Sequence, residues 1–513
     1  MKLDELLAGS EAVRIAGDSG VEIAGLGYDS RRIRPGEIFF SLAQDPGQER
    51  VHIEDALNRG ARAVVVRRMM DEMARPAVAL VECGRPRHLM GAAAARFFAA
   101  PSERIDLIGV TGTSGKTTTT YLLASIFEAA GMPAGIVGTI GIFIRAEKIY
   151  RGLTTPESLD LESALARMER EGVCAAAAEV SSIGIAEGRV DDLSFRACLF
   201  TNLGRDHLDY HDTMENYFAA KLRLFTEILP RSHRHDPIAI VNAGDPYGRR
   251  VIEAAAVRKV SFGLERAFDA HPLRFDADRS GIRATLSVLG KTIEIVSPLI
   301  GEFNLLNILG ASALSVALGI DAAAVAEGVR RCPGAPGRLE AVAAKPGVAI
   351  FVDYAHKPDA LEGVLKTLRT ICAGRLICVF GCGGDRDRGK RPIMGAIAGR
   401  LSDLPILTSD NPRTEEPLAI IAEVEEGIAA AGLLRIDHPE AVGPGQAPIP
   451  RGYVVEPDRR RAIALAMRIA AAGDVLIIAG KGHEDYQIVG NQTVPFDDRA
   501  VVREIAAEHT GQS

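Results

Sequence analysis

The most regular alternation of apolar and polar positions lies between residues 105 and 133. The apolar run from Ile105 to Val110 has the length of a buried strand, and a glycine-rich segment follows it. Beyond that segment, apolar residues recur at helical spacing from Leu122 to Phe127, and Gly131 ends the pattern. This succession predicts a strand, a tight loop and a helix.

The same rhythm of short apolar runs and helical stretches recurs along the rest of the chain. Runs that end in a polar cluster occur at residues 173–178, 197–201, 237–241, 348–352, 376–380, 405–408 and 475–478. Strands that alternate with helices predict parallel sheets covered by helices, and ligands bind outside the carboxyl ends of such strands. We therefore expect an α/β protein with one ligand crevice in the middle third and a second ligand surface in the last third.

Breaks in this rhythm suggest three domains. Short strands and helices fill the first 100 residues, and Pro101-Ser102 has the character of a linker. Residues 268–298 alternate with a period of two, which predicts an antiparallel insertion. A second linker candidate lies at Pro333–Arg338. We predict domains at residues 1–101, 102–335 and 336–513, and the length of 513 residues suits about three domains.

Composition narrows the class of protein. Hydrophobic residues at 47% and charged residues at 25% are ordinary globular values. The net charge of −7 offers no basic field, so we expect no nucleic-acid partner. The sequence lacks both a signal-peptide core and an apolar run of about 18 residues, so we expect no membrane insertion. Seven scattered cysteines suit a reduced compartment, and we expect a cytoplasmic protein.

The glycine-rich segment from Gly109 to Thr120 has the chemistry of a phosphate-binding loop. Backbone N–H groups in such a loop, at the start of a helix, bind phosphate oxygens. Lys116 would reach the β- and γ-phosphates, and the Thr117 hydroxyl would bind Mg²⁺. Val110 departs from the common pattern, which has a glycine there, and the alternative is a tight turn before an ordinary helix. The predicted phosphate-binding residues are Gly112, Thr113, Ser114, Gly115, Lys116, Thr117 and Thr118.

Glu179 and His207 follow two other strands of the middle third. A carboxylate and an imidazole near bound phosphates are plausible Mg²⁺ ligands, although histidine is an unusual one. Taken alone, His207 is more often a hydrogen-bonded core residue. Lys221, in a helix predicted from residue 214 to 229, is by itself a surface lysine.

The last third carries charged loops after its strands. Asp353 and His356 could reach a nucleotide, or Asp353 could cap the helix that begins near Pro358. Arg391, Arg413 and Glu484 come from three loops at one sheet edge. Two cations and an anion there would suit a zwitterionic amino acid, because a guanidinium binds a carboxylate through two hydrogen bonds. Asp410 and Asn411 could instead form a simple turn before Pro412.

Seven motifs together resemble the Mur ligases, and the resemblance covers nearly the whole chain in the family's motif order. They are Thr111–Thr117, Thr154–Glu157, Glu179–Ser182, Thr201–His211, Asp353–His356, Asp410–Arg413 and Gly480–Glu484. The resemblance implies an N-terminal domain that holds UDP, a central P-loop ATPase-like domain with a parallel sheet, and a Rossmann-like C-terminal domain that holds an amino acid.

The resemblance also implies a reaction and its residues. ATP, with Mg²⁺, would drive the joining of UDP-MurNAc-L-Ala-D-Glu to meso-diaminopimelate, through an acyl phosphate, in a monomeric enzyme. Asp-Asn-Pro-Arg is the family's pattern for diaminopimelate, whose second carboxylate suits Arg413. Lys221 would be carbamylated and would bind Mg²⁺ together with Thr117, Glu179 and His207. The other implied contacts are Ser30 for the uridine end, Thr154, Thr155, Ser182 and Arg189 for the muramoyl dipeptide, Asn304, Asn307, Arg338, Asp353 and His356 for ATP, and Arg391, Asp410, Asn411, Pro412, Arg413, Gly480 and Glu484 for diaminopimelate.

Three positions depart from the family's pattern. Ile183 replaces a common histidine, Glu187 a common glutamine and Lys357 a common threonine. A carboxylate at Glu187 that faced an anionic substrate would be unfavourable. Two other functions stay open at this point, namely a ligase like folylpolyglutamate synthetase and a nucleotide-switched binding protein without ligase activity.

Overall fold

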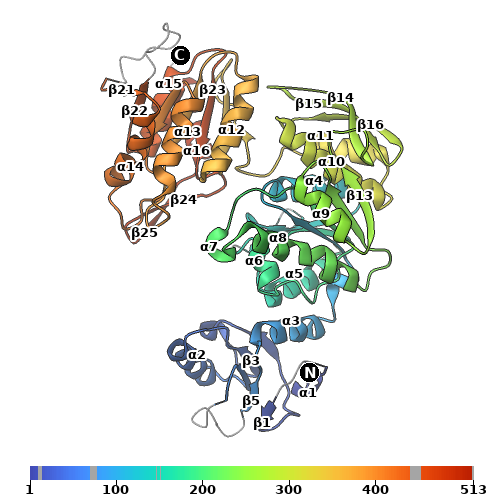
Figure 1. Cartoon of the computed structure of the whole chain (residues 1–513). Helices are drawn as coiled ribbons and strands as arrows, with labels where there is room; N and C mark the ends of the chain where they lie inside the picture. Colours follow the sequence, from blue (N-terminus) through green and yellow to red (C-terminus); the bar gives the residue numbers. More distant parts are fainter. Residues whose placement is uncertain (10–13, 70–77, 146, 151, 439–451, 511–513) are drawn as a thin grey trace. The chain divides into compact units, whose positions relative to one another are not determined.

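The computed structural model describes residues 1–9, 14–69, 78–145, 147–150, 152–438 and 452–510 (Figure 1). It has two compact units. One comprises Met1–Leu273, Thr285–Ile293 and Leu306–Val329, and the other comprises Arg274–Ala284, Glu294–Leu305 and Arg330–Ser513. The division into three domains at the boundaries given above remains a prediction.

The N-terminal region contains a small sheet. In its described residues, five strands lie in the order β1-β5-β4-β3-β2, parallel except for the pairing of β1 with β5. The strands are β1 (Arg14–Ala16), β2 (Gly25–Gly27), β3 (Glu37–Phe40), β4 (Ala63–Val66) and β5 (Ala79–Glu82). The helical elements are α1 (Leu3–Leu6), η1 (Ser30–Arg32), α2 (Pro46–Asn58), α3 (Pro86–Phe97) and η3 (Pro101–Glu103). Apolar residues of β3, β4, β5 and α3 form its core.

The middle of the chain forms a large mixed sheet. Its described strands lie in the order β16-β15-β14-β13-β12-β11-β6-β10-β7-β8-β9. They are β6 (Asp106–Thr111), β7 (Ala134–Gly138), β8 (Gly141–Ile144), β9 (Glu147–Tyr150), β10 (Ala175–Glu179), β11 (Ala197–Phe200), β12 (Ile238–Asn242), β13 (Arg258–Phe262), β14 (Ala270–Asp278), β15 (Gly281–Val288) and β16 (Lys291–Ser297). Strand β6 lies between β10 and β11 and is parallel to both, so their carboxyl ends meet at one edge.

Helical segments of this region connect the strands. They are α4 (Lys116–Ala129), α5 (Ser158–Arg170), α6 (Ser182–Ala186), α7 (Leu208–His211), α8 (Met214–Arg223), η4 (Leu224–Ile228), η5 (Leu229–Arg231), α9 (Pro246–Ala254), α10 (Glu302–Ala317) and α11 (Ala322–Arg331). The residues of β10 and β11 are all buried, as expected for parallel strands covered on both faces. Strands β14 to β16 fill the stretch where an antiparallel insertion was predicted, and they extend this sheet at one edge.

The C-terminal region contains a seven-stranded sheet in its described part, in the order β17-β18-β23-β19-β20-β22-β21. Its strands are β17 (Glu340–Ala341), β18 (Ala349–Asp353), β19 (Leu376–Phe380), β20 (Leu404–Leu407), β21 (Leu434–Arg435), β22 (Gly452–Val455) and β23 (Val475–Ala479), and β24 (Tyr486–Val489) pairs separately with β25 (Gln492–Pro495). The helices are α12 (Pro358–Ile371), α13 (Lys390–Leu401), α14 (Pro417–Ala430), α15 (Arg459–Ile469) and α16 (Asp498–Thr510).

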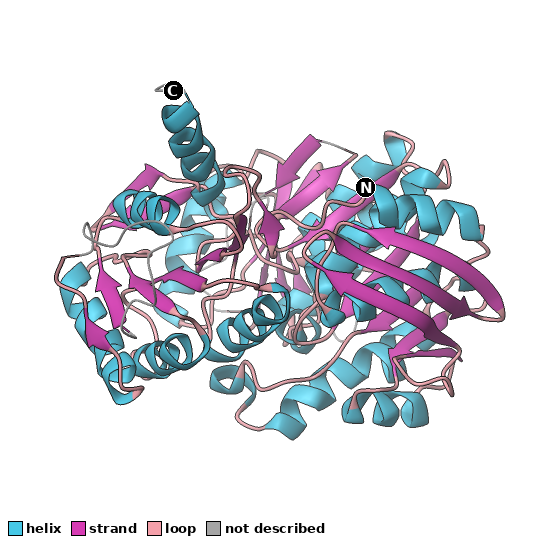
Figure 2. Cartoon of the chain, turned by 90° about the horizontal axis from the view of Figure 1, so that it is seen from above, coloured by secondary structure: helices cyan, strands magenta, loops and turns pink. Residues whose placement is uncertain are grey.

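Alternation along these strands explains why helices cover both faces of the sheet. In β19, Cys378 and Phe380 pack in one core with residues of α12, α13 and α14. Ile377 and Val379 pack in a second core with residues of α15 and α16. Figure 2 shows helices (cyan) flanking strands (magenta). The predicted α/β class is therefore confirmed, with parallel strands whose ends carry the polar loops.

The core of the first unit contains a carboxyl group that lacks a partner. Glu162 of α5 is 1% exposed, and neither carboxyl oxygen has a hydrogen-bond partner. Burial, with a further contribution from Asp192, raises the pKa of Glu162 from 4.5 to about 8. The folded protein thus keeps a proton that the unfolded chain loses above its ordinary pKa. Stability contributed by this group is full below pH 4.5 and is lost as the pH rises toward 8.

Glu162→Gln should remove this pH dependence, because glutamine resembles the protonated carboxyl group. We expect the melting temperature of the variant to match the wild type near pH 5 and to exceed it by a few degrees near pH 8, since each kcal/mol is worth about 2–4 °C. Differential scanning calorimetry at several pH values measures this, with Glu253→Gln on an exposed face of α9 as the control. A difference that stays constant with pH would show that Glu162 is ionised in the folded state.

Candidate active site

The glycine-rich loop joins β6 to α4, as the sequence predicted. Two of its glycines adopt backbone angles that disfavour other residues, with φ of +145° at Gly112 and +86° at Gly115. A Cβ atom at Gly112 would lie 1.9 Å from Oγ1 of Thr201, and one at Gly115 would lie 2.4 Å from Oδ1 of Asn307. The tight loop therefore needs glycine at both positions, for conformation and for space.

Residues after the neighbouring strand β11 hold the loop in place. The Ser114 N–H donates to Oδ1 of Asn202 (3.0 Å), and the Thr201 hydroxyl donates to the Ser114 carbonyl (2.6 Å). The Thr113 hydroxyl lies 3.1 Å from the Tyr217 hydroxyl. Sequence reasoning did not assign these supports to the site, although Thr201 and Asn202 do follow a strand whose pairing with β6 brings them here.

Two lysines meet at the carbonyl of Gly112. Nζ of Lys116 donates to that oxygen (2.8 Å), and so does Nζ of Lys221 (2.9 Å). Lys221 is 1% exposed, so its interpretation as a surface lysine is wrong. Its amine lies over the Tyr217 ring, 4.8 Å from the centroid. Burial, and then the charge of Lys116, lowers the pKa of Lys221 well below 10.5, which favours a neutral and nucleophilic amine.

Thr117 and Glu179 form the part of the predicted metal site that the structure brings together. The Thr117 hydroxyl donates to Oε2 of Glu179 (3.0 Å), and the Thr139 N–H donates to Oε1 (2.8 Å). Glu179 is 1% exposed at the end of β10. One hydroxyl and one carboxylate are hard oxygen donors of the kind that Mg²⁺ prefers, and Mg²⁺ keeps several waters besides. These residues therefore fit the predicted ion.

His207 is placed differently from a core histidine. Its side chain is 38% exposed, and Nε2 lies 3.4 Å from Oδ2 of Asp206. Its ring centroid is 6.1 Å from that of Tyr217, the residue that also contacts Lys221. Within the described residues, no group of three or more histidine, cysteine, aspartate or glutamate side chains is arranged to hold a metal ion. The role of His207 as a ligand remains a prediction.

Residues predicted to bind the muramoyl dipeptide gather around the end of β10. The Thr154 and Thr139 hydroxyls lie 3.1 Å apart, and the Thr155 hydroxyl donates to the Glu179 carbonyl (2.9 Å). Arg189 donates from Nη1 to the Thr155 carbonyl (2.9 Å). Ser182 at the start of α6 lies 2.9 Å from Nε2 of His211. Ser30, predicted to contact the uridine end, is buried in η1 of the N-terminal sheet region.

Glu187, which departs from the family's pattern, is compensated by two guanidinium groups. Its Oε2 lies 2.7 Å from Arg87 of α3 and 2.5 Å from Arg189. The same two arginines lie 3.2 Å from the carboxylate of Glu157. Two carboxylates and two guanidinium groups thus form a neutral cluster, so Glu187 does not present an uncompensated charge. Sequence reasoning missed Arg87, because nothing near it in the chain indicated that α3 reaches this place.

The residues predicted to line the nucleotide belong to different parts of the fold. Asn307 of α10 accepts at Oδ1 from the Thr119 hydroxyl (3.4 Å), beside the phosphate loop. Asn304 is buried and donates to the Ile300 carbonyl (2.9 Å). Arg338, Asp353 and His356 lie at the carboxyl end of β18 in the second unit.

Tyr354 connects these residues of the second unit. The Arg338 guanidinium lies over its ring, 4.9 Å from the centroid, and the His356 ring is 4.5 Å away. Asp353 is buried and accepts from the N–H groups of Leu339 (2.6 Å) and Ala355 (2.8 Å). Burial raises the pKa of Asp353, with Arg338 acting in the opposite direction, and burial lowers the pKa of His356 to about 4. Asp353 thus stabilises its own loop and does not cap α12 at Pro358.

The predicted amino-acid residues lie at the carboxyl ends of β19, β20 and β23, which are neighbours in the sheet. Asn411 donates from Nδ2 to Oε2 of Glu484 (2.9 Å). Arg413 is half-buried, has φ of +53° and donates to the Gly384 carbonyl (2.8 Å). Gly480 has φ of +118°, and a Cβ there would lie 3.2 Å from Oδ2 of Asp410. Asp410, Asn411 and Pro412 are buried.

The sequence predicted that Arg391 faces the ligand together with Arg413. In the structure, however, Arg391 contacts two carboxylates of the protein. Its side chain is 0% exposed, and the guanidinium lies 2.7 Å from Glu415 and 3.0 Å from Glu423. Its charge is thus neutralised by Glu415, which follows Asp410–Arg413 in the chain, and by Glu423 of α14. A direct contact between Arg391 and a ligand remains a prediction.

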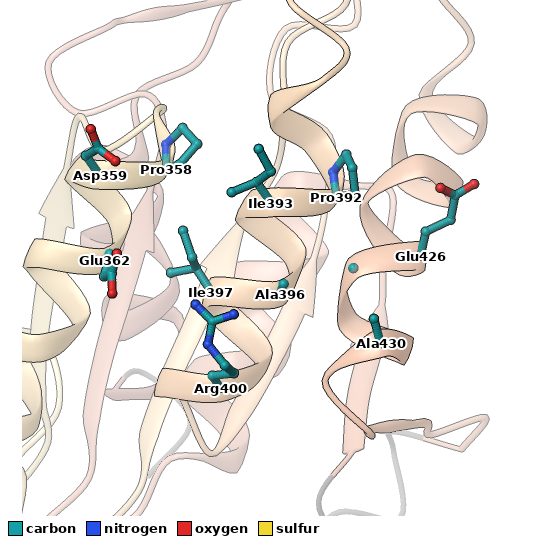
Figure 3. A pocket seen from close by; sticks show the side chains of 11 residues that line it. Pro358, Asp359, Glu362, Pro392, Ile393, Ala396, Ile397, Arg400, Glu426 and Ala430 are labelled. Carbon is teal, nitrogen blue, oxygen red and sulfur yellow. The ribbon is translucent and has the colours of Figure 1, made fainter. Parts of the chain in front are cut away.

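A surface pocket of about 520 Å³ lies between α12, α13 and α14, the helices that cover one face of this sheet (Figure 3). Its walls include Pro358, Ile393, Ile397 and Arg400, and Ala396 and Gly427 also line it. The predicted site residues do not line this pocket, since they follow the carboxyl ends of the strands. We therefore place the site at the strand ends, where the polar side chains converge.

Known proteins share both the sequence and the fold. Residues 110–315 match the Mur ligase middle domain, and residues 337–482 match the Mur ligase glutamate ligase domain. The UDP-N-acetylmuramoyl-L-alanyl-D-glutamate–2,6-diaminopimelate ligase of Geobacter sulfurreducens is 44% identical over 97% of each chain. The ligase of the same name from Solibacter usitatus is 41% identical over 94% of this chain and 93% of its own.

Solved structures agree. A 2,6-diaminopimelate ligase of the same name has a TM-score of 0.69 with 32% identity over 99% of each chain. A folylpolyglutamate synthase of Mycobacterium tuberculosis complexed with ADP has a TM-score of 0.60 at 19% identity, over 83% of this chain and 94% of its own, and so shares the fold. Within the described residues, no helix has the length and apolar character that crossing a bilayer requires.

Proposed function

The chain belongs to the Mur ligase family, and we propose that it adds meso-2,6-diaminopimelate to UDP-N-acetylmuramoyl-L-alanyl-D-glutamate in peptidoglycan biosynthesis. This is an ATP-dependent amide-bond formation that yields ADP and phosphate. The observation that carries the proposal is the cluster at the ends of β20 and β23, where Asn411 and Glu484 are hydrogen-bonded beside the half-buried Arg413. A carboxylate and a guanidinium suit the ammonium and carboxylate groups of a zwitterionic amino acid.

Two chemical steps account for the reaction. First, the D-glutamate γ-carboxylate attacks the γ-phosphorus of ATP, and the bond to the leaving ADP breaks as the acyl phosphate forms. Lys116 neutralises charge on the phosphates during this transfer. Second, the amine of diaminopimelate attacks the acyl carbon, loses a proton, and phosphate leaves from the tetrahedral intermediate. Positioning and electrostatic stabilisation supply most of the rate enhancement in such a sequence.

Mg²⁺ is part of the proposal. Thr117 and Glu179 would hold it, with His207 and Lys221 as the further ligands that the family resemblance implies. When bound, Mg²⁺ supplies positive charge that stabilises the phosphate oxygens. An amine is a poor Mg²⁺ ligand, so Lys221 fits this role only after CO₂ has converted its nitrogen into a carbamate, which presents carboxylate oxygens.

Carbamylation of Lys221 gives a direct prediction. A neutral buried amine attacks CO₂, whereas an ammonium does not, and burial favours the neutral form here. With ¹³C-labelled bicarbonate, we expect a carbamate signal by ¹³C NMR in the wild type and its loss in Lys221→Arg. Ligase activity should fall by a factor on the order of 10² or more in the variant. Lys259→Arg, at an exposed position of β13, should keep both signal and activity. A carbamate signal that persists in Lys221→Arg would contradict the assignment.

The remaining assignments are also proposals. ATP would be bound by the phosphate-loop residues Gly112–Thr118 and by Asn304, Asn307, Arg338, Asp353 and His356. Ser30, Thr154, Thr155, Ser182 and Arg189 would bind the UDP-muramoyl dipeptide. Asp410–Arg413, Gly480 and Glu484, with Arg391, would bind diaminopimelate. We propose a monomer that acts in the cytoplasm, with domains at residues 1–101, 102–335 and 336–513.

Product analysis tests the proposed function. The protein is incubated with ATP, Mg²⁺ and UDP-MurNAc-L-Ala-D-Glu, and meso-diaminopimelate or L-lysine is offered separately. Mass spectrometry should detect the diaminopimelate tripeptide and much less lysine product. Turnover with a folate and glutamate in place of these substrates would favour the folylpolyglutamate-synthetase-like alternative. ATP hydrolysis that is independent of both co-substrates, without ligation, would favour a nucleotide-switched binding protein.

A further inference from the structure

Lys481, which follows Gly480 at the end of β23, has an unusual environment for a lysine. Its side chain is 0% exposed. Nζ donates to Oδ1 of Asn411 and to Oε2 of Glu484, both at 3.2 Å. It also lies 3.7 Å from Oδ1 of Asp410 and 5.5 Å from the centroid of the Tyr486 ring. One buried ammonium group thus contacts three side chains of the proposed amino-acid site.

The charges in this cluster depend on that ammonium group. Asp410 is 6% exposed, its Oδ1 is buried without a hydrogen-bond partner, and the Lys481 ammonium group lies within ion-pair distance of that oxygen. The Glu484 side chain is 17% exposed. Two carboxylates that are largely out of water and close to one cation would repel each other without it. Leaving them uncompensated costs more than the pair contributes, because a buried charge without a partner is strongly unfavourable.

Other ionisable groups surround the cluster, and burial lowers the pKa of one of them, Lys390. Arg459 is held in a buried pair with Asp498, and Nζ of Lys390 donates to the His356 carbonyl. Burial lowers the pKa of His356 to about 4 and raises the pKa of Tyr354 and of Cys382 to about 12. Burial also raises the pKa of Tyr486 above 10.

We propose that Lys481 is a positioning residue for the amino-acid substrate, because it fixes Asn411 and Glu484 and compensates the negative charge of Asp410 and Glu484, which receive a substrate ammonium group. Both contacts to Glu484, from Lys481 and from Asn411, use Oε2, so Oε1 can accept from the ligand. Asn411 is held from two sides, because its Oδ1 also accepts from the Ile488 N–H (2.9 Å). This inference rests on the proposed function, since it assigns the ammonium end of the diamino acid to this cluster.

Steady-state kinetics of Lys481→Met test the role. The KM for meso-diaminopimelate should rise on the order of tenfold or more, because charge-assisted hydrogen bonds that orient the site are lost. The KM values for ATP and for the UDP-muramoyl dipeptide should stay within about twofold of the wild type. Lys366→Met, on the exposed face of α12 with a side chain that is 62% exposed, is the matched control and should behave as the wild type.

The pH profile separates positioning from a purely structural role. In the wild type, the KM for meso-diaminopimelate should be flat between about pH 6 and pH 8, because the Lys481 ammonium group compensates both carboxylates. In Lys481→Met the two carboxylates lose that cation, so the KM should fall as the pH increases through this range. The proposal would be overturned if Lys481→Met had the wild-type KM for meso-diaminopimelate. It would also be overturned if the KM of the variant did not change with pH and the variant differed only in the amount of folded protein.

A second variant and a change of substrate cover the cases in which Lys481→Met fails to fold or the proposed function is wrong. If Lys481→Met shows no cooperative melting transition, Lys481→Gln is measured in the same way, because glutamine keeps a donor but no charge. A wild-type KM that titrates between pH 6 and pH 8 would by itself refute the role. If the wild type accepts L-lysine or glutamate and not meso-diaminopimelate, the proposed function fails, and the same KM comparison with the accepted amino acid still decides the role of Lys481.

Discussion

Lys116→Ala should reduce ligation by a factor on the order of 10³ or more, because the variant loses the cation that neutralises charge on the transferring phosphoryl group. The loop geometry supports a specific effect on catalysis. Nζ of Lys116 is held by the carbonyls of Gly112 and Thr113, at 2.8 and 3.0 Å, within the loop itself. The backbone that forms the phosphate cradle is fixed by the positive φ angles of Gly112 and Gly115 and by the hydrogen bonds of Ser114 with Thr201 and Asn202, which the substitution leaves in place.

The measurement is the rate of tripeptide formation with all three substrates at saturation, together with a melting curve. Lys291→Ala on β16 removes an exposed lysine from the same unit and should leave the rate unchanged. The melting temperature of Lys116→Ala should remain close to that of the wild type, since the Gly112 carbonyl keeps its hydrogen bond from Lys221. Product formation at the wild-type rate would remove the phosphate loop from the mechanism.

The second large effect concerns the choice of amino acid. Arg413→Gln should lower kcat/KM for meso-diaminopimelate about ten- to hundredfold, the usual value of a charge-assisted hydrogen-bond pair. At its far end L-lysine carries an ammonium group and no carboxylate, whereas diaminopimelate carries both, so kcat/KM for L-lysine should stay the same or improve. The ratio of kcat/KM for meso-diaminopimelate to kcat/KM for L-lysine should therefore fall, mainly because the value for meso-diaminopimelate falls.

A matched control exists in the neighbouring loop. Arg386→Gln removes an exposed guanidinium that donates to the carbonyl of Asp385, and it should preserve the ratio of the two kcat/KM values. Glutamine does not add strain at position 413, because the positive φ of +53° is as unfavourable for arginine as for glutamine. An equal loss of activity toward both amino acids would indicate a general disruption of the loop and would contradict a selective role for Arg413.

The local pattern of apolar residues and glycines was sufficient to predict many of the strands and helices. The strand, loop and helix around residues 105–129 follow from an apolar run, glycines and helical spacing, and the structure has β6 and α4 there. The strands of the last third were predicted within a residue or two of β18, β19, β20 and β23. These signals are local because burial on both faces requires a continuous apolar run, and a tight loop requires glycine.

Interpretation of single residues was less reliable where the environment comes from distant segments. Lys221 has the neighbours of a surface lysine in sequence, and its burial against Tyr217 and Gly112 follows from how α8 packs near the phosphate loop. Arg391 and Arg413 both read as ligand-facing cations. The structure distinguishes Arg391, because its guanidinium is paired with Glu415 and Glu423. No spacing of residues in the sequence indicates this pairing.

The sequence by itself determined the α/β class, the phosphate loop and the set of polar clusters at strand ends, because apolar periodicity and glycine placement are properties of short segments. Tertiary structure decided which of these side chains are buried, which charges neutralise one another, and that Arg87 compensates Glu187 while Lys481 joins Asp410, Asn411 and Glu484. The physical reason is that desolvation and ion pairing depend on atoms brought together from strands far apart in the chain, and their effect on a charged group is set by that three-dimensional surrounding.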